Sequence, residues 1–272
     1  MHNSLNSIEV DGVLRHMGGW KPDLPDFRDY KVPDYLPSLI SPSAVPSSLL
    51  VDDFQIPVFD QEYLGSCTAN GTIFAYAQLA GLLGIPIPIL SRLYNYYFTR
   101  VNYEHIDPNE DSGAQIRNAI KCIAQFGSCL ERHWPYDPEP GIRFNVRPNR
   151  GAIKEAHQHM AIKYASVAAT VTMVKQVMTQ TKRPVVIGFS CYESLQSEQV
   201  SKTGIIPFPK ADEAQIGGHC VAIRGFRTDQ KLFRVRNSWG PSWGDHGDGY
   251  LPEQYLEAKL AADFWMLMTE MG

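Results

Sequence analysis

Three residues in this sequence, Cys67, His219 and Asn237, supply the types that nucleophilic catalysis by a thiol requires. A cysteine nucleophile needs a base that takes its proton, and the base needs an orienting group on its other nitrogen. Each residue alone has a simpler interpretation, because a cysteine is most often a small buried side chain and Asn-Ser-Trp is most often a turn. The joint occurrence of the three types favours acyl-transfer chemistry.

The position of Cys67 favours a reactive thiol. Apolar residues recur at spacings of three and four over residues 66–81, which predicts a helix that begins at the cysteine. A thiol at a helix N-terminus faces unpaired N–H groups and the positive end of the helix dipole. We therefore expect this setting to favour the thiolate, which is the nucleophilic form.

The elements that must position these residues change character along the chain. Periodicity predicts helices at 66–81, 91–100 and 114–126. Beyond about residue 160, short β-rich runs predict strands at 184–189, 219–223, 232–236, 249–251 and 264–269, after a helix at 171–180. His219 begins one of these strands and Asn237 follows another. Helices first and strands second predict an α+β fold of two lobes with a cleft between them.

Longer motifs surround the three residues. They are Gln61-x-x-x-Gly65-Ser66-Cys67, Asp111-Ser112-Gly113 leading to Trp134-Pro135-Tyr136, Gly218-His219, and Asn237-Ser238-Trp239-Gly240-x-x-Trp243-Gly244. In these motifs the sequence resembles the papain/cathepsin family of cysteine peptidases, and Leu-Gly-Ser-Cys-Thr-Ala-Asn resembles its bacterial branch. The resemblance covers about residues 46–272. It implies a papain-like two-lobed fold, with a helical left lobe, a β-barrel-like right lobe and the active-site cleft between them.

The resemblance implies a role for each catalytic residue. Cys67 would be the nucleophile, and His219 would be its general base and then the acid for the leaving amine. Asn237 would fix the orientation of the imidazole. Gln61 would form the oxyanion hole with the backbone N–H of Cys67, and one such donor is typically worth ~3 kcal/mol in the transition state.

The resemblance also implies a set of substrate-binding residues, namely Gly65, Ser66, Ser112, Gly113, Gly218, Trp239 and Trp243. Gly113 would pair its backbone with an extended substrate, which requires the close approach that only glycine allows. Trp239 would shield the Asn–His contact from water. Trp243 would line the leaving-group side.

Several positions depart from the family pattern. Thr68 and Asn70 stand where a tryptophan and a phenylalanine are usual, so aromatic packing behind the site is lost. Leu64 stands where many members have a disulfide cysteine. Gly218 replaces an acidic or polar residue, and Ser112 stands where a second glycine is common. None of these departures removes a catalytic group.

The other cysteines are expected to be structural. Five is an odd number, so at least one thiol is unpaired, and we expect Cys122, Cys129, Cys191 and Cys220 all to be free and buried. The absence of a C-x-x-C pair argues against a structural zinc site. Residues 107–118 imitate a calcium loop but lack its glycine and its final glutamate. We expect no metal and no cofactor.

Composition and charge exclude other classes of protein. Lys and Arg number 25 against 29 Asp and Glu, so the chain lacks the basic excess that binding nucleic acid needs. Glycines and prolines interrupt the longest apolar run, residues 79–90, which is too short to span a bilayer. The first twenty residues do not read as a signal peptide, which leaves the compartment open between cytoplasm and secretion by another route. We expect a monomer that binds neither nucleic acid nor membrane.

Residues 1–45, here called the leader, are expected to stand apart from a catalytic domain at 46–272. That domain divides into a mainly helical lobe at about 46–160 and a mainly β lobe at about 161–272. Alternating Pro, Asp and aromatic residues at 20–30 predict an extended segment. Two roles remain open for the leader, which either blocks the cleft as in a zymogen or packs outside it as a belt.

The expected function is hydrolysis of peptide bonds, most simply as an endopeptidase acting on peptides or proteins and open to peptidase inhibitors. One alternative is a catalytically silent relative that grips peptides, although such relatives tend to lose the cysteine or the histidine. Another is an exopeptidase or acyl transferase. The sequence has no recognisable two-histidine loop that would block one end of a cleft, and His105 alone does not make one.

Overall fold

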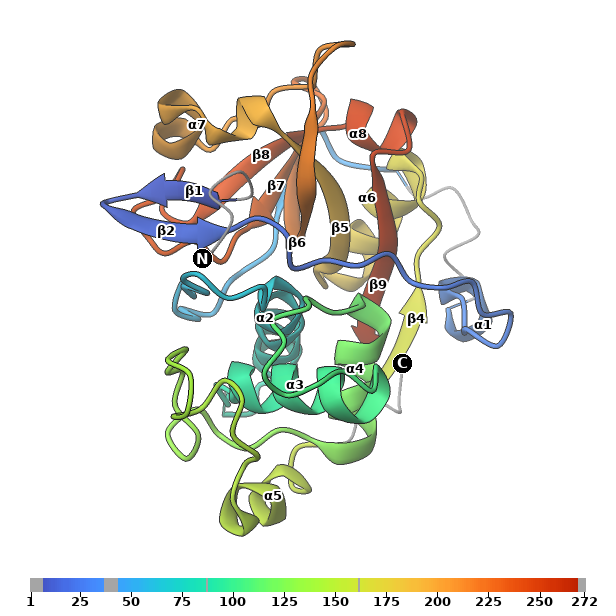
Figure 1. The fold of residues 1–272 in the computed structure, drawn as a ribbon. Coiled ribbons are helices and arrows are strands. Elements are labelled where there is room, and N and C mark those ends of the chain that lie inside the picture. Colours follow the sequence, from blue (N-terminus) through green and yellow to red (C-terminus); the bar gives the residue numbers. More distant parts are fainter. Residues whose placement is uncertain (1–6, 37–43, 87, 161, 269–272) are drawn as a thin grey trace.

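The computed structural model describes residues 7–36, 44–86, 88–160 and 162–268. A large antiparallel sheet and a group of helices form its two halves, one above the other in Figure 1. The helices are α1 (Val32–Tyr35), α2 (Cys67–Leu82), α3 (Arg92–Phe98), α4 (Ile116–Phe126), α5 (Arg150–Ala156), α6 (Val171–Thr181), α7 (Glu198–Thr203) and α8 (Gln254–Glu257), with a π-helical turn at Thr99–Tyr103 and a 3-10 turn at Glu193–Gln196. The strands are β1 (Ser7–Val10), β2 (Val13–His16), β3 (Ser48–Leu50), β4 (Lys163–Ser166), β5 (Val185–Tyr192), β6 (Gln215–Arg227), β7 (Leu232–Arg236), β8 (Asp248–Pro252) and β9 (Ala261–Met268).

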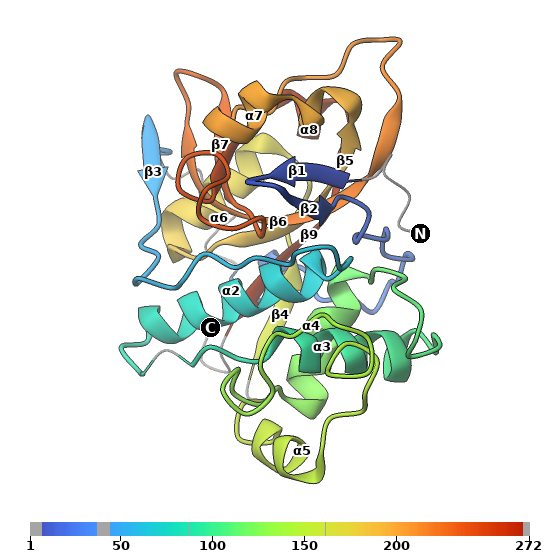
Figure 2. The ribbon, with the colours of Figure 1, turned by 60° about the vertical axis from the view of Figure 1, so that its left-hand side comes forward.

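Seven of the described strands form one sheet in the order β4-β9-β5-β6-β7-β8, and β3 pairs with the end of β6 (Figure 2). All of these pairings are antiparallel. Strand β5 is buried on both faces. Val185 and Ile187 pack into the core of the β lobe, whereas Val186 packs into the layer between the lobes. This double burial explains why its sequence is continuously apolar rather than alternating.

Helix α2 is the axis of the molecule. It contacts β5, β6 and β9 on one side and α3 and α4 on the other. Most of its residues are buried, including the polar Thr68 and Asn70. A helix that is buried on all sides can hold its first residue, Cys67, rigidly at the boundary between the two lobes.

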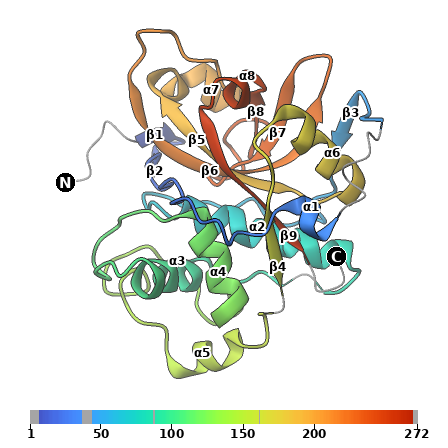
Figure 3. The same cartoon turned by 90° about the vertical axis from the view of Figure 1, so that its right-hand side faces the viewer.

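The leader forms a small hairpin and then an extended segment. Strands β1 and β2 pair with each other, and residues 17–31 then run without a regular element to α1. In Figures 1 and 3 the blue chain passes between the helical lobe and the sheet before it reaches α1. At that end Lys31 bridges to Ser166 in β4. The leader therefore contacts the rest of the molecule at several points along its described length.

The predicted elements correspond closely to the observed ones, and the expected α+β class is confirmed. Strand β7 matches its predicted range, and β6 extends four residues at each end beyond the predicted 219–223. The hairpin β1–β2 was not predicted. Thr269, the last residue of the predicted strand 264–269, lies outside the described residues. Within the ranges that the structure covers, no helix is long and apolar enough to cross a membrane.

Candidate active site

Cys67 is the first residue of α2 and is completely buried. Burial raises the pKa of its thiol to about 12, against the opposing effect of hydrogen bonds from the backbone of Cys220 and Thr68. The expectation that the helix N-terminus favours the thiolate is therefore wrong for this state of the molecule. The helix begins where predicted, but desolvation of the charged form outweighs the helix dipole.

His219 lies in β6 and is held by Asn237. Its Nε2 is 2.7 Å from Asn237 Oδ1, and the backbone N–H of Ser238 donates to the same oxygen at 2.7 Å. Because Asn237 Oδ1 accepts the Ser238 N–H, it is an acceptor for His219 too, and His219 Nε2 must be the donor. The proton is then on Nε2, which leaves Nδ1 as the basic nitrogen.

The basic nitrogen of His219 is unengaged. Its Nδ1 is buried and makes no hydrogen bond to any of the described residues. Burial lowers the pKa of His219 to about 4, although the hydrogen bond with Asn237 opposes this shift. The thiol of Cys67 and the imidazole of His219 are thus both neutral near pH 7 in this structure.

Two tryptophans close the site on the β side. Trp239 stacks on His219 with ring centroids 4.5 Å apart, and Trp243 meets Trp239 edge-on at 5.1 Å. Both indoles are almost completely buried. They exclude water from the contact between His219 and Asn237, and so strengthen that hydrogen bond.

Gln61 is fixed by Ser238, a residue that sequence reasoning did not single out. The hydroxyl of Ser238 donates to Gln61 Oε1 at 2.6 Å, and Gln61 N–H donates to the Ser238 carbonyl at 2.8 Å. This leaves Gln61 Nε2 as the donor, which bonds the carbonyls of Leu64 at 2.8 Å and His16 at 3.1 Å. The amide that the sequence assigns to an oxyanion hole therefore donates to a carbonyl of the leader.

The leader lies directly against Cys67. A Cβ atom added to Gly19 would lie 2.8 Å from Cys67 Sγ and 2.3 Å from the carbonyl oxygen of Gly65. On the helical side, Ala114 N–H donates to Gly19 O at 2.9 Å. On the β side, Trp20 N–H donates to Gly218 O at 3.1 Å. Both lobes thus bind one extended stretch of the leader at the thiol.

The glycines and the serines among the predicted substrate-binding residues have different surroundings. Gly65, Gly113 and Gly218 all face the leader, since a Cβ at any of them would contact it. Gly113 also has a φ of +68°, which suits glycine. The leader residue Trp20 pairs its backbone with Ala114, the residue that follows Gly113.

The two serines of this set are engaged elsewhere. Ser66 Oγ is 2.8 Å from Tyr136 Oη, and Ser112 Oγ donates to the carbonyl of Gly113 at 2.8 Å. Tyr136 in turn donates to the Gln61 carbonyl at 2.7 Å. Through Tyr136, Ser66 therefore helps to hold the loop that carries Gln61.

Polar residues behind the site replace the aromatic packing that Thr68 and Asn70 lack. Asn70 Nδ2 donates to the Ser66 carbonyl at 3.0 Å, and Arg92 donates to Asn70 Oδ1 at 3.2 Å. The Arg92 guanidinium also lies 4.1 Å above the Tyr136 ring. The one sequence signal for this network is an asparagine in a largely apolar helix.

Asp111 is a second residue that sequence reasoning did not assign. Its carboxylate accepts the N–H of Gly65 at 2.9 Å and the hydroxyl of Tyr96 at 2.5 Å. Tyr96 Oη also accepts the N–H of Gly113 at 3.0 Å. Asp111 and Tyr96 therefore tie together the two glycines that border the thiol on the helical side.

The remaining thiols lie in the interior. Cys122, Cys129, Cys191 and Cys220 are all free and buried, as expected from the sequence.

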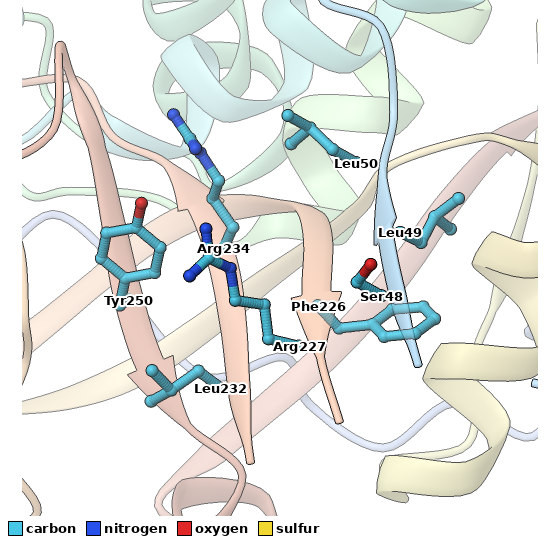
Figure 4. A pocket seen from close by; sticks show the side chains of 8 residues that line it. All are labelled: Ser48, Leu49, Leu50, Phe226, Arg227, Leu232, Arg234 and Tyr250. Carbon is cyan, nitrogen blue, oxygen red and sulfur yellow. The ribbon is translucent and has the colours of Figure 1, made fainter. Parts of the chain in front are cut away.

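A pocket between β3 and strands β6–β8 contains none of the candidate catalytic residues (Figure 4). It is lined by Ser48, Leu49, Leu50, Phe226, Arg227, Leu232, Arg234 and Tyr250.

Comparison with known proteins agrees with this geometry. Residues 104–256 match the family described as papain family cysteine protease. An uncharacterized peptidase C1-like protein of Acanthamoeba polyphaga mimivirus is 42% identical over 76% of this chain and 68% of its own length. Xylellain, a cysteine protease from Xylella fastidiosa, superimposes with a TM-score of 0.82 at 32% identity, over 93% of this chain and 96% of that one.

More distant structures share the fold. The Carica candamarcensis cysteine protease, solved in complex with E-64, has a TM-score of 0.58 at 19% identity and covers 83% of this chain and 99% of its own. The papain-like α+β fold implied by the motifs is thus confirmed. From the matched family and the extent of these similarities, the chain belongs to the papain family of cysteine proteases and is a hydrolase.

Proposed function

We propose that this chain hydrolyses internal peptide bonds through Cys67, His219, Asn237 and Gln61. The observation that carries the proposal is the state of His219. Its Nε2 is held by Asn237, and its Nδ1 is buried and makes no hydrogen bond to the described residues. The next residue in the chain is Cys220, and the backbone of Cys220 is hydrogen-bonded to the Cys67 thiol. A base oriented in this way can take a thiol proton and return it to a leaving group.

The proposed reaction has two stages. His219 takes the Cys67 proton, and the sulfur attacks the substrate carbonyl to form a tetrahedral oxyanion. The carbon–nitrogen bond breaks as His219 gives its proton to the leaving amine, which leaves a thioester on Cys67. Water then gives a proton to His219 and attacks the thioester. The carbon–sulfur bond breaks, the acid product leaves, and the Cys67 sulfur takes the proton back from His219.

Gln61 would stabilise the oxyanion in both stages. We expect Gln61→Glu to lower kcat by about 10²- to 10³-fold with little change in KM, because it replaces the Nε2 donor by an oxygen of similar shape. Steady-state kinetics on a fluorogenic peptide under reducing conditions measures both constants. The matched control is Ser238→Ala, which removes the orienting hydroxyl but keeps the donor, so a smaller loss is expected. Equal kcat for Gln61→Glu and the unsubstituted protein would contradict the role.

The path of the leader supports endopeptidase rather than exopeptidase action. The chain crosses the thiol at Gly19 and continues beyond it in both directions, to His16 at Gln61 and to Asp23 at Asp263. A groove that holds a continuous segment on both sides of the nucleophile can hold the interior of a substrate. Cleavage of peptides blocked at both termini tests this choice, since an exopeptidase needs a free end.

The same contacts support a zymogen-like role for residues 1–45, next to a catalytic domain at 46–272. Of the two roles left open by the sequence, blocking is favoured over an outer belt because Gly19 is packed on Cys67 and His16 O occupies the donor of Gln61. With the leader in place, Cys67 and His219 are buried and both are neutral near pH 7. Departure of the leader would admit water and substrate together.

Asp23 would make this block dependent on pH. Burial, together with the nearby Asp263, raises the pKa of Asp23 from 3.8 to about 7, against Trp265 and Arg117, which lower it. The docked leader therefore binds this proton more tightly than the free leader. The contribution of Asp23 to docking of the leader is complete below about pH 4 and is lost as the pH rises through 7.

We accordingly expect Asp23→Asn to hold the leader in place at high pH. The rate at which a thiol-directed epoxide labels Cys67, read by mass spectrometry, reports opening of the cleft. The rate for Asp23→Asn divided by that of the unsubstituted protein is expected to fall by about tenfold or more between pH 5 and pH 8. The same ratio at both pH values would show that Asp23 does not control docking.

Inhibitors are further proposed partners of the same cleft. The Carica candamarcensis relative was solved in complex with E-64, and we propose that this chain also accepts peptidase inhibitors once the leader is displaced. A catalytically silent peptide-binding role is the rival. The presence of both Cys67 and His219 favours the enzyme.

A further inference from the structure

A buried cluster of charges joins strands β6, β7 and β8. At its centre is the carboxylate of Asp248, which is only 1% exposed. Its Oδ2 accepts Arg224 Nη1 at 2.7 Å and Arg234 Nε at 2.6 Å, and its Oδ1 accepts Arg236 Nε at 2.6 Å. A second carboxylate, Asp53, lies 3.2 Å from Arg224 and 3.0 Å from Arg236. Among the described residues, Asp248 is thus the one carboxylate that binds all three arginines.

Asp248 and Arg236 form the two ends of one loop. Residues 237–247 leave β7 after Arg236 and return to the sheet at Asp248, and these two end residues are direct partners in the β7–β8 pairing. Inside the loop, Asn237 N–H donates to Gly247 O at 2.9 Å, and Asp245 N–H donates to Asp248 O at 2.9 Å. The backbone of Asn237 therefore depends on the place where Asp248 is held.

Packing against α2 does not fill the space behind the start of this loop. A small cavity of about 10 Å³ lies there. Arg236, Asn237 and Ser238 line it from the loop, and Gly71 and Phe74 line it from α2. The volume is enough for about one water molecule. The start of the loop thus has room to shift, unless contacts at its ends prevent it.

The cluster is a costly way to stabilise a fold. Arg224 Nε and Arg236 Nη1 are buried and make no hydrogen bond to the described residues. A buried donor without a partner lowers the free energy of unfolding. A well-packed apolar cluster in place of buried ion pairs is often equally stable or more stable. A requirement for position explains this arrangement better than a requirement for stability.

The position of Asn237 in turn decides the orientation of His219. Asn237 Oδ1 accepts His219 Nε2 at 2.7 Å, and this contact weakens steeply when the two groups turn or move apart. A displacement of a catalytic group by about 1 Å can lower a rate by about 10²-fold. A small shift of the loop is therefore enough to impair the proposed base.

We propose that Asp248 is a positioning residue for the reaction. Its carboxylate, bonded to Arg224, Arg234 and Arg236, fixes the ends of the loop 237–247, so that Asn237 keeps its hydrogen bond to His219. Asp248 acts through Asn237 and touches neither the substrate nor the reacting atoms. The proposal rests on the proposed peptidase function.

The test is a double-mutant cycle in full-length Gly19→Ala protein, here called the parent, in which the leader is expected to be displaced. Asp248→Asn keeps the size of the side chain but removes its charge and turns one acceptor into a donor that faces an arginine. We expect it to lower kcat by about 10- to 100-fold with little change in KM. In an Asn237→Ala background, the same substitution should change kcat by less than about threefold, because the contact through which Asp248 acts is already gone.

A pH profile separates positioning from stability. Asn237 Oδ1 accepts a proton that the His219 imidazolium carries, and this hydrogen bond raises the pKa of His219. The alkaline limb of kcat/KM should therefore move to lower pH in Asp248→Asn and in Asn237→Ala alike. Circular dichroism gives the folded fraction by which each kcat is divided, so loss of folded protein alone would leave the limb in place.

Asp53→Asn is the matched control. It removes a carboxylate that binds two of the same arginines but does not belong to the loop. We expect it to change kcat by less than about threefold and to leave the alkaline limb in place. An effect of Asp53→Asn equal to that of Asp248→Asn would assign the result to the charge of the cluster and overturn the proposal.

Two further results would overturn it. One is a kcat for Asp248→Asn within about threefold of the parent, and the other is an equal fold loss in the parent and in the Asn237→Ala background. If Asp248→Asn does not fold, Arg236→Lys takes its place in the cycle, since it keeps the charge but not the shape of the guanidinium. Unfolding of both variants would assign the cluster to stability alone. Failure of the parent itself to hydrolyse any peptide would instead contradict the proposed function.

Discussion

Cys67→Ala is expected to lower kcat/KM for fluorogenic peptides under reducing conditions by at least about 10⁴-fold. The substitution removes the sulfur that forms the thioester, and neither His219 nor Gln61 can supply another nucleophile. Loss of a nucleophile from a preorganised site costs nearly the whole covalent route, because the base and the oxyanion hole then have nothing to activate. The site is buried at the start of a rigid helix, so an alanine there leaves the surrounding geometry in place.

Two controls separate chemistry from folding. Cys67→Ser keeps the shape and a hydroxyl of higher pKa, and it should also lose nearly all activity. Cys191→Ala removes a buried thiol of the β lobe outside the proposed machinery, so it should lower stability while the folded fraction keeps its activity. Retention of hydrolysis in Cys67→Ala, at a similar folded fraction by circular dichroism, would show that another residue is the nucleophile.

Gly19→Ala is expected to open the cleft and to raise the rate of Cys67 labelling by about 5- to 150-fold. The added Cβ would lie 2.3 Å from the Gly65 carbonyl oxygen and 2.8 Å from Cys67 Sγ, distances at which real Cβ atoms are not found. The two nearest atoms belong to the Gly65 backbone and not to a side chain that can rotate away, so the leader must move. Forcing a methyl group into a well-packed contact typically costs about 1–3 kcal/mol, and that cost corresponds to this range in the docking equilibrium.

Gly18→Ala is the matched control for Gly19→Ala. Its Cβ would lie 2.7 Å from Nε2 of the His16 side chain, which can rotate away, so little effect on labelling is expected. Peptide hydrolysis should rise together with labelling in Gly19→Ala. If both alanine variants label at the rate of the unsubstituted protein, the leader does not control access to Cys67 and the belt interpretation is favoured.

The fold could largely be predicted from the sequence because its elements have clear local signals. Helix α2 begins at the predicted cysteine, in a stretch that is rich in alanine and other apolar residues. The run Val185–Phe189 is apolar throughout because β5 packs against a hydrophobic core on each of its two faces. The β1–β2 hairpin was missed because four-residue strands give too little periodicity to detect.

The candidate site was less predictable, because its details depend on contacts between distant parts of the chain. The motifs identified the four proposed catalytic residues, but nothing near Cys67 in the sequence indicates that residues almost fifty positions earlier cover it. The leader contributes to the burial that raises the pKa of the Cys67 thiol against the effect of the helix dipole. Likewise, the role of Ser238 toward Gln61 appears only once two loops meet.

The carboxylate of Asp263 illustrates a further limit. A register shift between β5 and β9 decides where this side chain points, and register is set by the whole sheet. A sequence pattern predicts the strand β9 but not the register shift in its pairing with β5. The partner of Asp263, Trp20, lies more than two hundred residues away, so no local rule joins the two.

The assignment of Cys67 as the nucleophile is the central claim, and one measurement tests it most directly. Full-length Gly19→Ala protein is titrated with a thiol-directed epoxide, while hydrolysis is followed and the labelled residue is identified by peptide mapping. We predict one adduct, on Cys67, and a loss of activity in proportion to the fraction labelled. Activity that persists when Cys67 is completely labelled, or inactivation through one of the other four cysteines, would contradict the account.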